Sequence, residues 1–129
     1  MLPSLAPWLT VADGHRAAKF YRAAFGAEEV YRLDGPEGSV VVRLAVGSVE
    51  FWVSGEGTGG SNEPPVGVLG GGTVRMILTV EDPDAVYAQA LAAGAVEVFP
   101  VGEGHGWRLG RLVDPFGLHW EVGRPLGGH

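Results

Sequence analysis

The chain has 129 residues, of which 46% are hydrophobic and 19% charged, a balance that excludes a disordered protein and allows one domain or two half-domains sharing a core. Its net charge is −6 with nine Lys and Arg residues, so nucleic acid and anionic membranes are not expected as partners. With no cysteine and no export or membrane-spanning pattern, we exclude disulfides and cysteine nucleophiles and expect a cytoplasmic location.

The first predicted elements are a strand over residues 5–11 and a helix over residues 14–25. Asp13 is a favourable N-cap, and Gly26 stands where a left-handed C-terminal cap is needed. Between them, apolar residues recur at steps of three and four, which indicates an amphipathic helix with one buried stripe: Ala17, Phe20, Tyr21, Ala24 and Phe25.

Three strands are predicted next, over residues 28–33, 40–46 and 49–53. Glycine-bearing links at 34–38 and 47–48 join them, as is typical of antiparallel hairpins.

A glycine-rich stretch over residues 55–72 separates two halves of the chain and is predicted to be a linker or a mobile flap. The predicted organisation is a first module over residues 1–54, this linker, a second module over residues 73–123 and a tail over residues 124–129. The two modules together are expected to form one domain.

The second half repeats the first. Leu9-Thr-Val-Ala-Asp13 returns 69 positions later as Leu78-Thr-Val-Glu-Asp82, and Phe25-Gly-Ala-Glu-Glu-Val30 returns 68 positions later as Ala93-Gly-Ala-Val-Glu-Val98. Each half reads β-α-β-β-β, which predicts an α+β fold. Because so small a unit buries little surface alone, we expect the mixed sheets of the two modules to form a shared cleft.

In the second half, a helix is predicted to start at Pro83 after the N-cap Asp82, and strands are predicted over residues 96–101, 107–113 and 118–122. The last two strands are joined by the turn Asp114-Pro-Phe-Gly117. Strand alternation places Trp120 on the face that packs under a helix, and His119 and Glu121 on the other face, toward water or a polar cavity.

Several landmarks occur in the same order in a known family. They are Leu9-Thr-Val-Ala-Asp13, Phe20-Tyr-Arg-Ala-Ala-Phe-Gly26, Val80-Glu-Asp-Pro-Asp84, Arg111-Leu-Val-Asp-Pro-Phe-Gly117 and Trp120-Glu121. Through them, nearly the whole chain resembles the vicinal oxygen chelate superfamily of glyoxalases, bleomycin resistance proteins and extradiol dioxygenases, and most of all its branch named after a phosphonate-operon protein. The resemblance implies two β-α-β-β-β modules, a homodimer, and a sheet cavity that holds either a divalent metal or a ligand without metal.

The resemblance also implies four positions for metal ligands, on the first and last strands of each module. In this chain they carry Ala6, Glu50, Arg75 and Glu121. Alanine has no donor atom, and arginine stays cationic, so two of the four residues are suited to bind a metal.

The sequence leaves three interpretations of Glu50, Arg75 and Glu121 open. Arg75 pairs with one or both carboxylates in the cavity and replaces the metal with a fixed internal charge. Alternatively, the carboxylates bind one divalent ion such as Zn, Ni, Mn or Fe, and His119 joins them. In the third interpretation, the residues are unrelated and lie on exposed strand edges. His119 is expected to face solvent or contact a ligand, because neighbours on one strand face are roughly 6.5–7 Å apart; His15, His105 and His129 are not expected to be ligands.

Trp8 and Trp52 share the strand parity of Ala6 and Glu50, and Trp107 follows a glycine-rich segment. Aromatic walls with a few polar groups suit a planar or cationic small ligand, although tryptophans on strands are also common in cores. The predicted ligand-binding residues are therefore Trp8, Glu50, Trp52, Arg75, Trp107, His119 and Glu121.

Three functions follow as hypotheses. The first is a noncatalytic dimer of the bleomycin resistance type that sequesters a small molecule in an aromatic, acidic cleft and has no complete metal site. The alternative is a metal-dependent lyase, isomerase or dioxygenase of the glyoxalase type, in which Glu50 and Glu121 bind the metal and His119 is a ligand or general base. The third is a regulatory or scaffold dimer without a ligand.

Overall fold

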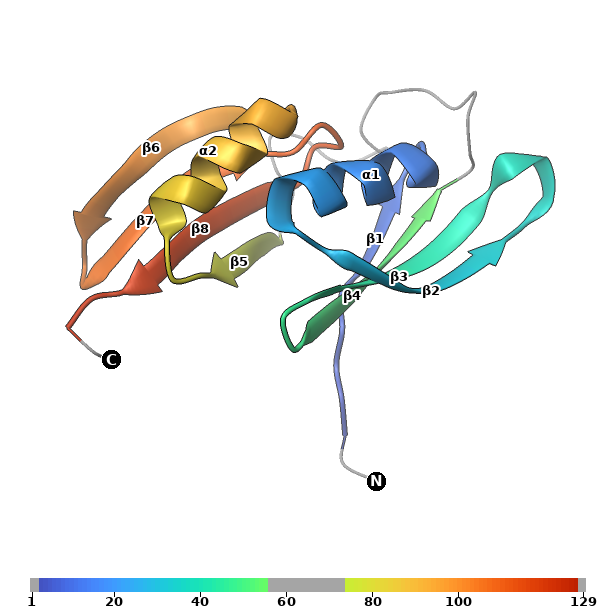
Figure 1. The fold of residues 1–129 in the computed structure, drawn as a ribbon, viewed down its shortest axis with the longest axis horizontal. Coiled ribbons are helices and arrows are strands. Elements are labelled where there is room, and N and C mark those ends of the chain that lie inside the picture. Colours follow the sequence, from blue (N-terminus) through green and yellow to red (C-terminus); the bar gives the residue numbers. More distant parts are fainter. Residues whose placement is uncertain (1–2, 56–73, 128–129) are drawn as a thin grey trace. The chain divides into compact units, whose positions relative to one another are not determined.

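The computed structural model describes residues 3–55 and 74–127, which form two compact units divided between Pro65 and Val66. Each unit is one four-stranded sheet with one helix (Figure 1). Neither helix is long and apolar enough to cross a membrane. The glycine-rich stretch predicted as a linker or flap, residues 55–72, lies outside the described residues except for Gly55.

Unit 1 contains β1 (Trp8–Val11), α1 (Gly14–Phe25), β2 (Glu28–Asp34), a short 3-10 helix (Pro36–Gly38), β3 (Val40–Val46) and β4 (Val49–Gly55). The strand order is β1-β4-β3-β2, in which β1 runs parallel to β4 and the other neighbours are antiparallel. The predicted helix and all four predicted strands are present in this unit.

Unit 2 contains β5 (Arg75–Thr79), α2 (Pro83–Ala93), β6 (Val96–Gly104), β7 (Trp107–Val113) and β8 (His119–Pro125). Its order β5-β8-β7-β6 and its strand directions match those of unit 1. The predicted α+β fold of two β-α-β-β-β modules is therefore confirmed. The cleft between the two sheets stays a prediction.

Helix α1 forms where the sequence places a cap at each end. The side chain of Asp13 accepts a hydrogen bond from the Arg16 amide at 3.0 Å, and Gly26 closes the helix with φ 69°, a conformation that costs glycine little. The apolar stripe of the helix packs on one face of the sheet, where Tyr21 meets Phe51 edge to face at 5.4 Å. This face of unit 1 is its core: Leu9, Val11, Val40, Val42, Leu44, Phe51 and Val53.

Helix α2 packs on β6, β7 and β8 of unit 2 in the same way. The hydroxyl of the buried Tyr87 has three acceptors within hydrogen-bond distance and donates its one hydrogen to one of them at a time: the side chain of Glu97 at 3.1 Å and the carbonyls of Phe99 at 2.9 Å and Arg111 at 3.1 Å. The ring needs Gly110 beneath it, because a Cβ there would lie 2.9 Å from the ring carbon Cε2. Tyr87 therefore ties the helix to β6 and β7.

The turn between β7 and β8 is organised by Asp114, which is 4% exposed. Its carboxylate accepts hydrogen bonds from the amides of Phe116 at 2.9 Å and Leu118 at 3.0 Å and from Trp120 Nε1 at 2.8 Å. Trp120 is 3% exposed on the core face, as predicted. One carboxylate thus fixes both the turn and the first residues of β8.

We expect Asp114→Ala to lower the free energy of unfolding by about 2–4 kcal/mol, because it removes three hydrogen bonds to a buried carboxylate. Urea unfolding followed by tryptophan fluorescence measures the effect. The matched control is Asp34→Ala, whose carboxylate is 65% exposed and should change stability by less than about 0.5 kcal/mol. Equal effects of the two substitutions would contradict this role of Asp114.

Candidate functional site

Each unit has a second sheet face, opposite its helix, which we call the helix-free face. Residues paired across neighbouring strands lie on the same face, so the register identifies its members. In unit 1, Trp8 pairs with Trp52, Trp52 with Arg43, and Arg43 with Tyr31. In unit 2, Ile77 pairs with Glu121, Glu121 with Arg111, and Arg111 with Phe99.

The helix-free face of unit 1 is an aromatic surface. The rings of Trp8 and Trp52 are stacked, with centroids 5.6 Å apart and an interplanar angle of 17°, and Tyr31 meets Trp52 at 5.8 Å with an angle of 67°. Trp8 Nε1 donates a 2.9 Å hydrogen bond to Ser54 Oγ, which fixes the first ring. Trp8 is nevertheless 54% exposed, so this surface presents aromatic area at a low ordering cost.

Arg43 lies on the same aromatic surface. Its guanidinium carbon is 5.3 Å from the centroid of a Trp52 ring, within cation–π range. Its Nε is 3.1 Å from Glu50 Oε1, and the two side chains form an ion pair. The N–H of this buried Nε does not point well enough at an acceptor to make a hydrogen bond with any described residue. Glu50 therefore holds the arginine by charge, and the arginine covers the tryptophan.

The helix-free face of unit 2 carries charged groups at the corresponding place. Arg75 Nε lies 3.4 Å from Glu121 Oε2, and Arg111 Nε donates a 3.0 Å hydrogen bond to His119 Nδ1. His119 is only 8% exposed, so it does not face solvent, and the other part of the expectation, that it contacts a ligand, stays a prediction. It is buried because β8 lies inside the sheet and Arg111 covers the imidazole.

The contact with Arg111 fixes the protonation of His119. An arginine N–H can only donate, so Nδ1 must be an acceptor, and the proton of the neutral imidazole is on Nε2. Burial lowers the pKa of His119, and the positive charge of Arg111 lowers it further. His119 is therefore neutral at pH 7 and presents an N–H donor.

The two faces are related by the internal repeat. The register makes Arg43 the counterpart of Arg111, and both arginines reach diagonally to the next strand, Arg43 to Glu50 and Arg111 to His119. Glu121, in turn, corresponds to Trp52. The sequence reasoning missed both arginines, although positions 43 and 111 are separated by the repeat distance of 68.

The predicted site residues fall into two groups. Unit 1 brings together Trp8, Glu50 and Trp52, and unit 2 brings together Arg75, His119 and Glu121. Arg75 pairs with Glu121, as one interpretation expected, and the partner of Glu50 is Arg43. A cluster that joins Glu50 to the residues of unit 2 stays a prediction.

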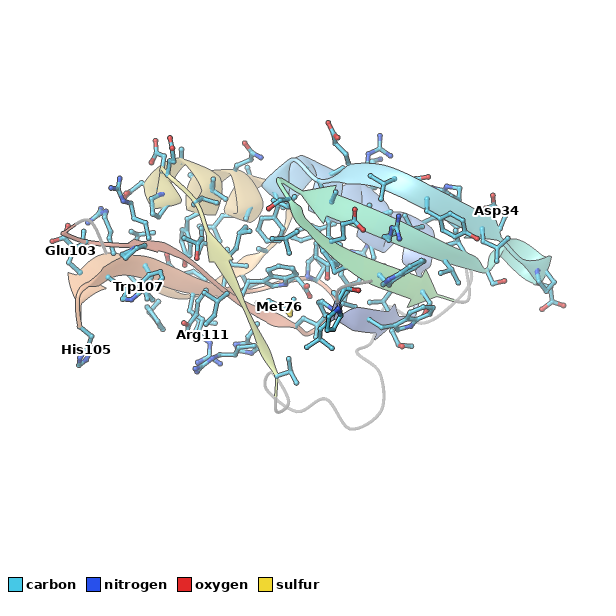
Figure 2. The ribbon with its side chains drawn as sticks, turned by 90° about the horizontal axis from the view of Figure 1, so that it is seen from below. Asp34, Met76, Glu103, His105, Trp107 and Arg111 are labelled. Carbon is cyan, nitrogen blue, oxygen red and sulfur yellow. The ribbon has the colours of Figure 1, made fainter. Side chains whose placement is uncertain are left out.

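Trp107, the remaining predicted binding residue, lines a hollow of about 370 Å³ on unit 2. The other walls come from β6, β7 and the turn between them: Phe99, Pro100, Gly102, Glu103, Gly104, His105 and Leu109. Figure 2 shows Trp107 and Arg111 on the same strand, β7. Leu109, the last lining residue along β7, is two positions from Arg111.

A profile of the family described as "Glyoxalase-like domain" matches residues 8–123. The chain belongs to this family. An uncharacterized protein of Mycobacterium bovis is 38% identical over 130 residues, a match that covers 96% of this glyoxalase-like chain and 84% of the relative. A protein of Mycobacterium tuberculosis strain H37Rv, also uncharacterized, has the same identity and is covered to 75%.

Solved structures share the fold. TioX from Micromonospora sp. ML1 is 27% identical with a TM-score of 0.72, and the match covers 97% of this chain and all of TioX. Glyoxalase I from Zea mays is 19% identical with a TM-score of 0.74, and the match covers 95% of this chain and 44% of the enzyme. At 19% identity, the similarity to the maize enzyme shows a shared fold and says nothing about the activity of this chain.

The side chains of this glyoxalase-like chain do not fit the four metal ligands that the resemblance implies. Ala6 has no donor atom and Arg75 is cationic. The register gives Trp52, which cannot ligate a metal through its indole, as the counterpart of Glu121, so Glu50 is displaced by two residues from that position. Glu121 alone combines a suitable donor with the implied place, and Arg75 already pairs with it.

We expect Arg111→Gln to raise the pKa of His119 toward its ordinary value of 6.5, because a neighbouring positive charge is removed, while burial still holds the pKa below that value. NMR titration of the imidazole signals measures this, with His119→Asn to assign the signal.

In the unaltered chain, the lowered pKa means that the stability contributed by neutral His119 is complete above pH 6.5 and decreases as the pH falls below it.

The control for this titration is Arg108→Gln, which removes the same charge from β7. Arg108 pairs with Asp84 at 2.6 Å on the other face of the strand. It should leave the His119 titration unchanged. A His119 pKa that does not respond to Arg111→Gln would show that the guanidinium does not act on the imidazole.

Proposed function

We propose that this glyoxalase-like chain is a small-molecule binding protein that holds planar aromatic ligands on the helix-free faces of its sheets and has no complete set of metal ligands. The observation that carries the proposal is the stacked pair Trp8 and Trp52, whose outer ring is half exposed. A planar ligand that covers this indole would remove apolar surface from water, which is favourable.

The aromatic surface is also rigid, which supports a binding role. Trp52 is held between Trp8, Tyr31 and Arg43, and the indole of Trp8 is hydrogen-bonded to Ser54. Because these side chains are already ordered, a ligand that stacks on them loses little affinity to the immobilisation of the protein. A planar ligand then gains stacking contacts in addition to buried area.

The donor set supports binding without a metal over metal-assisted catalysis. The fixed guanidinium of Arg75 pairs with Glu121, so the one well-placed carboxylate already has a cation. The lyase, isomerase or dioxygenase alternative needs that carboxylate together with Glu50, whose own partner is Arg43. Both carboxylates are thus engaged by arginines. The homodimer and the cytoplasmic location stay predictions of the same proposal.

We expect Trp52→Ala to weaken the binding of a planar aromatic ligand about tenfold or more, because it removes the central ring of the aromatic surface. Tryptophan fluorescence quenching against a panel of planar aromatic compounds identifies a ligand, and calorimetry gives its dissociation constant for both proteins. The control is Val49→Ala, which truncates a residue of the same strand that is 63% exposed. A panel with no quenching at all would contradict the proposed function.

Removing metal should leave ligand binding unchanged. Protein dialysed against EDTA and protein supplied with Zn, Ni, Mn or Fe are expected to give the same dissociation constant, because three of the four positions implied for ligands carry Ala6, Trp52 and Arg75. Parallel titrations with metal analysis of each sample make the comparison. Affinity that appears only in the metal-loaded sample would favour the metal-dependent alternative.

A further inference from the structure

The helix-free face of unit 2 has an excess of positive charge, although the whole chain carries −6. Arg75 and Arg111 share this face with one carboxylate, Glu121, and with His119, which is neutral. Arg75 makes the ion pair with Glu121. Two guanidinium groups against one carboxylate leave one positive charge over.

That uncompensated charge is on Arg111. Its Nε donates to the neutral imidazole of His119, and no ion pair involves its guanidinium within the described part of the chain. The nearby carboxylate of Asp114 is engaged on the core side by Trp120 and by the turn amides of Phe116 and Leu118. Arg111 is half-buried, where a charge without a counter-ion is unfavourable.

A mainly apolar hollow, whose lining also includes Glu103 and His105, lies next along the sheet from this arginine. Phe99 is the register partner of Arg111 on β6, and Leu109 lies two residues from it on the same face of β7. Both residues line the hollow of about 370 Å³ together with Trp107. Figure 2 labels Trp107 and Arg111, which both lie on β7. A ligand whose flat apolar ring occupies the hollow could thus direct a substituent of that ring toward the guanidinium of Arg111.

We propose that unit 2 binds an aromatic carboxylic acid, with its ring in the hollow beside Phe99 and Trp107 and its carboxylate on the guanidinium of Arg111. This inference rests on the proposed function and narrows its ligand to one class. The planar guanidinium can bind a carboxylate through two parallel hydrogen bonds, and the ligand supplies the counter-charge that the face lacks. Neutral His119 adds no negative charge to this face.

The same charges disfavour the cationic ligand that the acidic composition suggested. A cation in the hollow would approach Arg111, and Glu121 is already neutralised by Arg75. The net charge of the chain is negative, but its acids near this strand have other partners: Asp84 pairs with Arg108 on the opposite face of β7, and Glu103, although it lines the hollow, pairs with the same arginine. The local charge therefore selects the ligand.

Calorimetry on the full chain with three matched compounds tests the proposal: 2-naphthoate, 2-naphthamide and 2-naphthylmethylamine. The acid should bind about tenfold to a hundredfold more tightly than the amide, and the amine should bind most weakly. Arg111→Gln should reduce the affinity for the acid to that for the amide and leave the affinity for the amide unchanged. Trp107→Ala should weaken the acid and the amide alike, because both rings would occupy the hollow.

Two further variants complete the experiment. Arg124→Gln removes an equal charge from the opposite face of the unit 2 sheet, where Arg124 donates to the carbonyl of Glu81, and should leave all three affinities unchanged. Arg111→Lys keeps the charge without the planar guanidinium and should retain part of the preference for the acid, which keeps the test valid if circular dichroism shows that Arg111→Gln is misfolded.

The outcomes separate this inference from the function on which it rests. Equal binding of acid and amide, or an affinity for the acid that does not change in Arg111→Gln, would overturn the assignment of the acid to Arg111 while the chain remains a binder of planar compounds. Tighter binding of the amine would overturn the charge argument. No binding of any of the three, together with no quenching by the wider panel, would overturn both proposals.

Discussion

Each unit of this chain has one helix for two sheet faces, and the site follows from that constraint. The crossover from β1 through α1, and from β5 through α2, covers one face of a four-stranded sheet with apolar contacts. The opposite face receives no helix from its own unit, and its side chains make ordering contacts with one another. In unit 1 those contacts are aromatic stacking on Trp52, and in unit 2 they are the charged and polar contacts of Arg75 and Arg111.

Much of the fold was predictable because its signals are local. Asp13 and Asp82 cap their helices as the sequence indicated, and the two strands over residues 40–46 and 107–113 have the predicted bounds. The internal repeat added the long-range information that local patterns lack, since two copies of one unit must have one topology. The family resemblance pointed to the same architecture, and the family profile confirms it.

The partners within the site were not predictable in the same way. Strand parity correctly placed Glu50 with Trp52 and Glu121 with His119, but parity does not specify which residue lies opposite on the next strand. The register decides that Glu50 meets Arg43 and that His119 meets Arg111. Burial of His119 likewise depends on the inside position of β8 in its sheet, which the order of strands along the chain does not reveal.

The two copies of the site differ in what their common arginine binds. In unit 1 it pairs with the carboxylate of Glu50 and covers Trp52, so the charge is compensated and the surface offers mainly aromatic area. In unit 2 the same arginine meets the neutral imidazole of His119, so its charge is not compensated by the residues around it. An arginine cannot release its proton to relieve this cost, as a lysine or histidine can. The charge must therefore be balanced by solvent or by a ligand, and this makes unit 2 the part of the chain with a defined electrostatic preference.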